Sequence, residues 1–171
     1  LHELGKFKEA EVCFIKAINL EPNYVEAQSN LGNTYKDQGN FKKAIAAYNK
    51  AILINSDYSE AHYNMGLTLQ LLGKLEKAVE SYTKAIELIA NYAEAHNNLG
   101  NILFKKGKIN EAIEAYKNSI LVKNNNHQAW HNIFYVLQCV KQNYSTIECF
   151  VSDLFKNTYS NSVETFKQIL I

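Results

Sequence analysis

A repeat of 34 residues constrains the fold of this chain more than any other feature of its sequence. Three segments, 25–55, 59–89 and 93–123, superpose when the sequence is aligned with itself at an offset of 34 residues. Residues 1–22 match the second part of the same unit, and residues from 127 onward start another. A period of this length predicts a stack of small hairpins that bury their apolar faces against one another. We expect the chain to begin inside a repeat, which leaves open whether a signal peptide has been removed.

Each repeat has the apolar spacing of two amphipathic helices. In residues 25–58, Leu31 and Tyr35 lie four positions apart in the first half, and Ala44, Tyr48 and Ala51 follow the same rule in the second. Spacings of three and four residues place side chains on one face of an α-helix. The chain is therefore predicted to be all-α.

Glycine occupies two fixed positions in each repeat. One lies in the middle of the first helix, where the missing side chain lets the paired helix approach closely, opposite an alanine of the second helix. The other lies where the first helix must end, a place that favours a left-handed residue. The first position holds Gly32, Gly66 and Gly100, opposite Ala44, Ala78 and Ala112, and the second holds Gly39, Gly73 and Gly107.

The starts of the first helices show a regular polar pattern. A residue that can cap a helix is followed, three positions later, by a glutamate or glutamine, as in a capping box. The pairs are Asn23 with Glu26, Asp57 with Glu60, Asn91 with Glu94, and Asn125 with Gln128. We expect these side chains to have a structural role.

The repeat resembles the tetratricopeptide repeat (TPR) family. The match is carried by the mid-helix glycines and the alanines opposite them, by Tyr48, Tyr82 and Tyr116, by Ala51 and Ala85, and by the single proline, Pro22. The family's usual tryptophan position holds Gln28, His62, His96 and Trp130. The resemblance implies a right-handed α-solenoid of helix-turn-helix repeats, whose first helices line a concave groove.

The repeat pattern also sets the expected domain boundaries. The array covers 1–140: a partial first repeat 1–24, repeats 25–58, 59–92 and 93–126, and the first helix of a further unit, 127–140. Residues 141–171 are expected to form a degenerate helical cap, with helices starting near Ser145–Glu148 and Asn161–Glu164. A cap covers the apolar end face of a solenoid. The apolar tail also allows another interpretation, a scaffold that forms homo-oligomers through residues 141–171.

Composition argues against several other functions. All 18 basic residues are lysine and the formal charge is +1, so the chain lacks the arginine forks and the positive potential that favour nucleic-acid binding. Its longest apolar run, residues 133–137, is far shorter than the ~20 residues of a membrane-spanning helix. Cys13, Cys139 and Cys149 fit no paired spacing, which suits reduced, mostly buried thiols and a cytoplasmic location.

No catalytic or metal site is expected. His127 and His131 have the i, i+4 spacing of zinc ligands, but no second Cys/His pair follows them. His62 and His96 fall in the tryptophan position and are expected to pack. Because every glycine already has a role in helix packing or helix ends, a phosphate-binding loop is excluded. We therefore expect a chain that is not itself an enzyme and needs no cofactor.

One polar pattern stands apart, an asparagine ladder on the first helices. Its members at 34-residue intervals are Asn30, Asn64, Asn98 and Asn132; Asn33, Asn101 and Tyr63 share the same face. A carboxamide offers both a donor and an acceptor to a peptide backbone. The ladder therefore predicts a protein–protein interaction module that binds an extended peptide or a partner protein in the groove. A coding bias toward asparagine is the alternative explanation.

The ladder implies a geometry for the bound chain. Packed helices lie 8 to 10 Å apart, so asparagines of adjacent repeats should be ~10 Å apart, close to three residues of an extended chain. Four hydrogen bonds of ~0.5 to 1.5 kcal/mol each give no more than ~6 kcal/mol. Tyr63, Tyr135 and Phe104, which share this face, are expected to add apolar contact.

Within the family, this arrangement is similar to the superhelical arm of O-GlcNAc transferase and its bacterial relatives, where groove asparagines at this position hold substrate backbones. The resemblance rests on Asn30, Asn64, Asn98 and Asn132 and suggests an alternative function, the substrate-selecting arm of a larger transferase. The chain does not resemble the chaperone-tail clamps of the family. Those clamps need lysine or arginine where this sequence has Ser29, Tyr63, Asn97 and His131.

Overall fold

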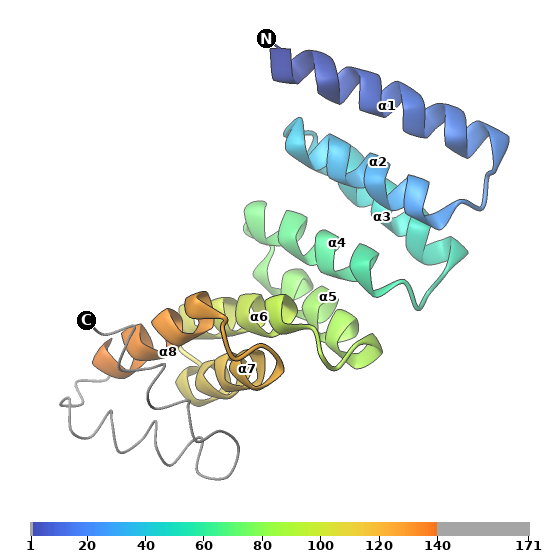
Figure 1. Cartoon of the computed structure of the whole chain (residues 1–171). Helices are drawn as coiled ribbons and strands as arrows, with labels where there is room; N and C mark the ends of the chain where they lie inside the picture. Colours follow the sequence, from blue (N-terminus) through green and yellow to red (C-terminus); the bar gives the residue numbers. More distant parts are fainter. Residues whose placement is uncertain (1, 140–171) are drawn as a thin grey trace. The chain divides into compact units, whose positions relative to one another are not determined.

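The computed structural model describes residues 2–139, which form eight α-helices and no strand (Figure 1). The helices are α1 (His2–Leu20), α2 (Val25–Asp37), α3 (Phe41–Ile54), α4 (Ser59–Leu71), α5 (Leu75–Leu88), α6 (Ala93–Lys105), α7 (Ile109–Val122) and α8 (His127–Cys139). The predicted all-α solenoid of helical hairpins is confirmed. The two helices expected near Ser145–Glu148 and Asn161–Glu164, and the cap as a whole, lie outside the described residues.

The helices pair as the repeat predicts, α2 with α3, α4 with α5 and α6 with α7. The chain divides into two compact units between Ala90 and Asn91. The N-terminal unit contains α1 to α5 and the C-terminal unit contains α6 to α8. Among the described helices, none is long and apolar enough to cross a bilayer.

A glycine and a tyrosine hold each hairpin together. Gly32 of α2 lies against the ring of Tyr48 in α3, so closely that a Cβ atom on Gly32 would be 2.5 Å from the ring. The pairs Gly66–Tyr82 and Gly100–Tyr116 repeat this contact, and all three rings are buried. The predicted close approach at the mid-helix glycines is therefore confirmed, with a tyrosine ring as the partner. The opposing Ala44, Ala78 and Ala112 are fully buried.

The glycine after each first helix has the predicted left-handed conformation. Gly39 has a φ of 76°, and Gly73 and Gly107 have nearly the same value. Beyond Gly39, the amide of Asn40 donates to the carbonyl of Tyr35 at 2.7 Å, which satisfies a helix-end carbonyl in a Schellman motif. This turn directs the second helix back along the first.

The predicted capping boxes are wrong. The helices α2, α4 and α6 begin one residue later than expected, so that Tyr24, Tyr58 and Tyr92 occupy the N-cap positions, and none of them makes a side-chain cap. The predicted caps Asn23, Asp57 and Asn91 therefore lie one residue too early to reach the first turn. Among α2, α4, α6 and α8, only α8 is directly preceded by an asparagine, and there Asn126 Oδ1 accepts from the amide of Ala129 at 3.3 Å. The predicted partners have other contacts, since Glu60 accepts from the Tyr58 hydroxyl and Gln128 donates to Asn132.

Candidate functional site

The candidate site is the first-helix face, which we define separately in each unit. In the N-terminal unit it is the surface of α2 and α4, which pack against each other and are drawn in front of α3 and α5 in Figure 1. In the C-terminal unit it is the surface of α6 and α8, which also pack together. Each of these four helices carries one member of the ladder.

The two N-terminal members, Asn30 and Asn64, have unused carboxamides. Their backbone carbonyls accept hydrogen bonds from Thr34 and Thr68, each at 2.9 Å. Their side-chain amides make no hydrogen bond within residues 2–139. Asn30 is half-buried and Asn64 is 7% exposed, so the Asn64 carboxamide is restricted to a narrow approach from solvent. Donors and acceptors of this kind are available to a ligand backbone.

The two flanking asparagines have a structural partner. The hydroxyl of Tyr48 donates to Asn33 Oδ1 at 2.8 Å, and the hydroxyl of Tyr116 donates to Asn101 Oδ1 at 2.9 Å. In the repeat between them the equivalent position is Leu67, and the hydroxyl of Tyr82 instead donates to Gln70 Oε1 at 2.9 Å. The sequence analysis did not predict that these asparagines accept from tyrosine hydroxyls. The available signal was that the residue after the mid-helix glycine is Asn33, Leu67 and Asn101 in successive repeats.

The buried tyrosines make the free energy of unfolding depend on pH in the alkaline range. Burial raises the pKa of Tyr116 to about 12 and also raises the pKa of Tyr48, compared with 10.0 for a free tyrosine. The folded state therefore favours the neutral phenol, and this stabilisation is complete below pH 10 and is lost as the pH rises toward 12. We expect the free energy of unfolding, measured by urea titration with circular dichroism, to fall over this range. Tyr116→Phe should give a shallower fall, and an unchanged slope would contradict the assignment.

The C-terminal member, Asn132, is already hydrogen-bonded on both sides of its carboxamide. Its Nδ2 donates to Asn97 Oδ1 at 3.0 Å and to Asn101 Oδ1 at 2.9 Å, and its Oδ1 accepts from Gln128 at 3.1 Å. These bonds join α8 to α6. Asn98 is half-buried on α6. The ladder positions are therefore chemically different, with unused amides on α2 and α4 and a satisfied amide on α8.

Aromatic side chains accompany the asparagines in both units. Tyr63 lies next to Tyr82, with ring centroids 5.8 Å apart. In the C-terminal unit Phe104 and Tyr135 meet edge to face at 5.9 Å, and Tyr135 is 53% exposed. Phe104 of α6 and Tyr135 of α8 thus lie side by side, and their predicted contact with a ligand stays a prediction.

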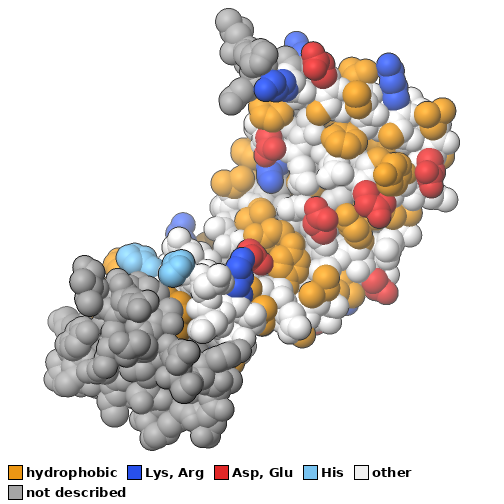
Figure 2. Space-filling model, in the orientation of Figure 1, with side chains coloured by type: hydrophobic (Ala, Val, Ile, Leu, Met, Phe, Trp, Pro, Cys, Tyr) orange, Lys and Arg blue, Asp and Glu red, His pale blue; other side chains and the backbone are white. Residues whose placement is uncertain are grey.

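The charge on this face does not suit a carboxylate clamp. In the view of Figure 2 most of the surface is backbone, uncharged polar side chains and apolar side chains, with scattered acidic and lysine side chains among them. At the positions where a clamp needs cations, Ser29 is fully buried, Asn97 is nearly so and Tyr63 is half-buried. A neutral backbone fits this surface better than a terminal carboxylate.

The histidine in the tryptophan position packs as predicted. His62 is buried and its Nε2 lies 3.0 Å from the carbonyl of Ser56, while Trp130 Nε1 donates to the carbonyl of Asn124 at 3.0 Å. These two contacts are equivalent, because the residues match at an offset of two repeats. Within residues 2–139, no three metal-ligating side chains lie close enough together to hold a metal ion. Cys13 and Cys139 are free thiols, as predicted, but both are exposed, so the prediction of mostly buried thiols is wrong for these two cysteines.

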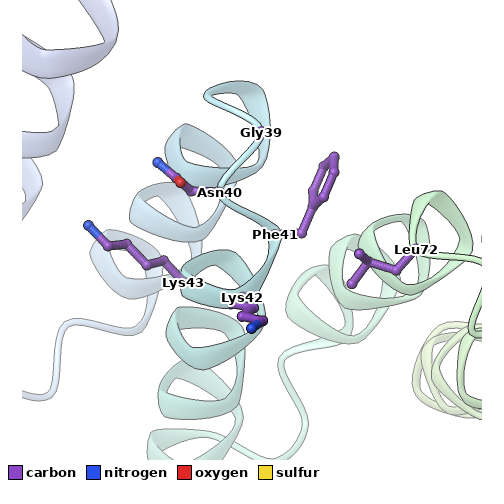
Figure 3. A pocket seen from close by; sticks show the side chains of 6 residues that line it. All are labelled: Gly39, Asn40, Phe41, Lys42, Lys43 and Leu72. Carbon is purple, nitrogen blue, oxygen red and sulfur yellow. The ribbon is translucent and has the colours of Figure 1, made fainter.

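Two hollows in the N-terminal unit were not predicted. The first, of about 320 Å³, is lined by Gly39 to Lys43 at the start of α3 and by Leu72 at the end of α4 (Figure 3). The second, also of about 320 Å³, has a floor of Ile45, Met65 and Leu69, and its rim includes Lys74, Lys77 and Glu80. Leucines at 69 and 72, where the preceding repeat has Tyr35 and Gln38, are the sequence signal that could have indicated them.

Together, the paired helices, the glycine–tyrosine contacts and the left-handed turns define a helical repeat protein. A family model described as "TPR repeat" matches residues 1–39, 32–73 and 71–107, and one described as "Tetratricopeptide repeat" matches residues 93–126. The chain belongs to the tetratricopeptide repeat family. Neither matching model describes a catalytic family. No curated protein matches the chain.

Solved structures share the fold. A crystal structure of MamA is 27% identical, with a TM-score of 0.75, and the match covers 99% of this chain and 90% of that one. A second MamA structure is 25% identical, with a TM-score of 0.76 and coverage of 98% and 86%. The first TPR domain of Spaghetti (RPAP3), bound to the HSP90 peptide SRMEEVD, is 23% identical, with a TM-score of 0.66 and coverage of 69% and 94%. The family and these neighbours support a protein–protein interaction module.

Proposed function

We propose that this chain binds an extended polypeptide segment on its first-helix face and holds the segment by its backbone. The observation that carries the proposal is the pair Asn30 and Asn64, which occupy equivalent positions on adjacent helices and have no side-chain partner within the described residues. That a protein of the same fold, the RPAP3 domain, binds a peptide supports this type of ligand.

The Asn64 carboxamide is mostly enclosed but still reaches solvent, because the unpaired side-chain atoms sealed from solvent within residues 2–139 are Ser29 Oγ and Asn124 Oδ1. A backbone amide of a ligand, with one donor and one acceptor, can replace water at this carboxamide. The proposed spacing of ~10 Å between Asn30 and Asn64 matches about three residues of an extended chain. Backbone contacts at this spacing tolerate many side chains in the bound segment.

The C-terminal unit would bind a segment in the same way on its own first-helix face. There Asn98 holds the ladder position on α6, although it already has an interaction of its own, and the Phe104–Tyr135 pair supplies apolar contact for side chains of the segment. Asn101 and Asn132 would contribute less, because their oxygens already accept hydrogen bonds and the Asn132 amide joins α8 to α6. The ladder from Asn30 to Asn132 thus has stronger and weaker positions.

Peptides selected from a random phage-displayed library against the chain provide the test. We expect Asn30→Ala and Asn64→Ala each to lower the affinity for the selected peptides about fivefold, since a lost net hydrogen bond costs ~1 kcal/mol. Fluorescence anisotropy of a labelled peptide measures the affinity, and circular dichroism checks the fold. Asn110→Ala, which removes an exposed asparagine from α7, is the matched control and should leave affinity unchanged.

Methylation of single amide nitrogens in the selected peptide tests the backbone contact directly. Loss of binding at positions about three residues apart supports the proposal. If both asparagine variants bind as the wild type does, or if methylation has no effect at any position, the proposed recognition of the backbone is wrong.

The position of the ladder asparagines within the repeat favours a second proposal, in which the module selects substrates for a transferase. It rests on the similarity of the ladder to the superhelical arm of O-GlcNAc transferase. Translation of the gene beyond Ile171 distinguishes the two, because a nucleotide-sugar domain in the same reading frame supports the second proposal and a stop codon contradicts it.

A further inference from the structure

The two hollows lie where α3 meets α4, and the second is also lined by residues of α5 and the turn before it. Phe41 and Ile45 are four residues apart on α3, while Leu69 lies on α4 and Leu72 is the residue that caps its C-terminal end. We call this region the α3–α4 seam, formed by Phe41, Ile45, Met65, Leu69 and Leu72. In Figure 3, Phe41 and Leu72 lie on the same side of α3, while Lys43 extends the opposite way.

The equivalent positions one repeat earlier carry polar side chains with contacts of their own. The ammonium of Lys43 on α3 lies 5.1 Å from the ring centroid of Tyr35 on α2, the counterpart of Leu69. Gln38, the counterpart of Leu72, donates to Glu11 at 3.1 Å. The α3–α4 seam has apolar residues at these positions and Ile45 in place of Glu11, so these polar contacts are replaced by apolar side chains. Leu72 is accordingly 38% exposed.

The rim of the α3–α4 seam is positively charged. Lys42, Lys74 and Lys77 line the two hollows, are exposed, and form no ion pair within residues 2–139. Glu80 is the acidic residue that lines them. The first turn of α3 contains no acidic residue, whereas α5 has Glu76 there. Lysines near the start of a helix are unfavourable for the helix itself, so stability does not explain Lys42.

We propose that the α3–α4 seam is a second docking surface, for an acidic amphipathic helix of a partner protein. Each hollow, at about 320 Å³, is near the lower limit of ligand pockets and accommodates one large apolar side chain rather than a cofactor. Side chains three or four residues apart on the partner helix match hollows one helical turn apart, and its carboxylates face Lys42, Lys74 and Lys77. Although α4 contributes to both surfaces, this one uses Met65, Leu69 and Leu72 and does not depend on Asn30 or Asn64.

The test uses a fluorescein-labelled helical peptide of alanine and glutamate that carries two leucines four residues apart. We expect it to bind the full chain, as measured by anisotropy, and the variant Lys42→Glu/Lys77→Glu to bind it at least about tenfold more weakly. Leu72→Gln, which introduces the residue found at position 38, should weaken binding about fivefold and keep the fold. The matched controls on α3, Lys50→Glu and Leu53→Gln, should leave affinity unchanged, since both residues are exposed and line neither hollow.

Three outcomes would overturn the proposal. The first is that the labelled peptide shows no saturable binding. The second is that Lys50→Glu lowers the affinity for the peptide as much as the double variant does, which indicates general charge attraction. The third is that a peptide with both leucines replaced by glutamine binds equally well. Asn64→Ala should not change binding of the labelled helix, so failure of this proposal leaves the proposed backbone recognition untouched, and the reverse is also true.

Discussion

Trp130→Ala is expected to lower the free energy of unfolding of the C-terminal unit by about 3 to 5 kcal/mol. Trp130 is 0% exposed, and it packs in a cluster that includes Tyr116, Ile133 and Leu137. Its indole also donates to the Asn124 carbonyl, which is left without that donor in the variant. The cavity and the lost hydrogen bond act in the same direction, so this is the largest effect we expect from one substitution.

Hydrogen exchange is the measurement that assigns the loss to a unit. Amides of α6, α7 and α8 should exchange faster in Trp130→Ala, while those of α2 to α5 keep their protection. Trp130→Phe is the control, because it retains most of the buried volume and should cost clearly less. A loss below about 1 kcal/mol would show that neighbouring side chains fill the space.

Gly32→Ala is expected to destabilise the N-terminal unit by about 2 to 3 kcal/mol, although alanine favours a helix over glycine by ~1 kcal/mol. The added Cβ would be 2.5 Å from Tyr48 Cε1, and the buried ring has no room to move. The sign of the effect therefore separates a packing role from simple helix propensity. Chemical denaturation followed by circular dichroism measures it.

A second glycine provides the comparison. At Gly39 an added Cβ meets no atom within 4 Å, and the cost of alanine there comes only from the left-handed backbone, about 1 to 2 kcal/mol. Replacing the Tyr48 ring with a smaller side chain, in the double variant Gly32→Ala/Tyr48→Leu, should recover part of the stability lost in Gly32→Ala. The same replacement should not recover the stability lost in Gly39→Ala. If Gly32→Ala stabilises the protein, the close contact with Tyr48 is not the reason for the glycine.

Features that depend on spacing within one repeat were predictable from the sequence. The 34-residue period and the glycine positions identify the two helices and the turn between them, although the mid-helix glycines contact tyrosine rings and not the predicted alanines. Gly32 and Gly39 illustrate why, since each has a local physical requirement that few other residues meet. His62 was likewise placed correctly, because it shares a position with Trp130.

Features that depend on a shift of one residue or on contacts between repeats were not predictable. The capping residues were placed wrongly because the turn after each second helix is one residue longer than the capping pattern assumes. The bonds from Asn132 to Asn97 and Asn101 need the register of two packed helices, which a repeat pattern leaves open. The α3–α4 seam is apolar because repeat 59–92 has leucine at both positions where repeat 25–58 has Tyr35 and Gln38. This is a difference between repeats, whereas the repeat pattern is built from the positions that they share.

The tyrosine hydroxyl bonds have a consequence for how the protein forms. They join residues only 15, 12 and 15 positions apart in the sequence, at Tyr48, Tyr82 and Tyr116. Low contact order favours rapid folding, because little chain entropy is lost before a contact forms. Each hairpin can therefore close soon after it leaves the ribosome, before the following hairpin has been synthesised.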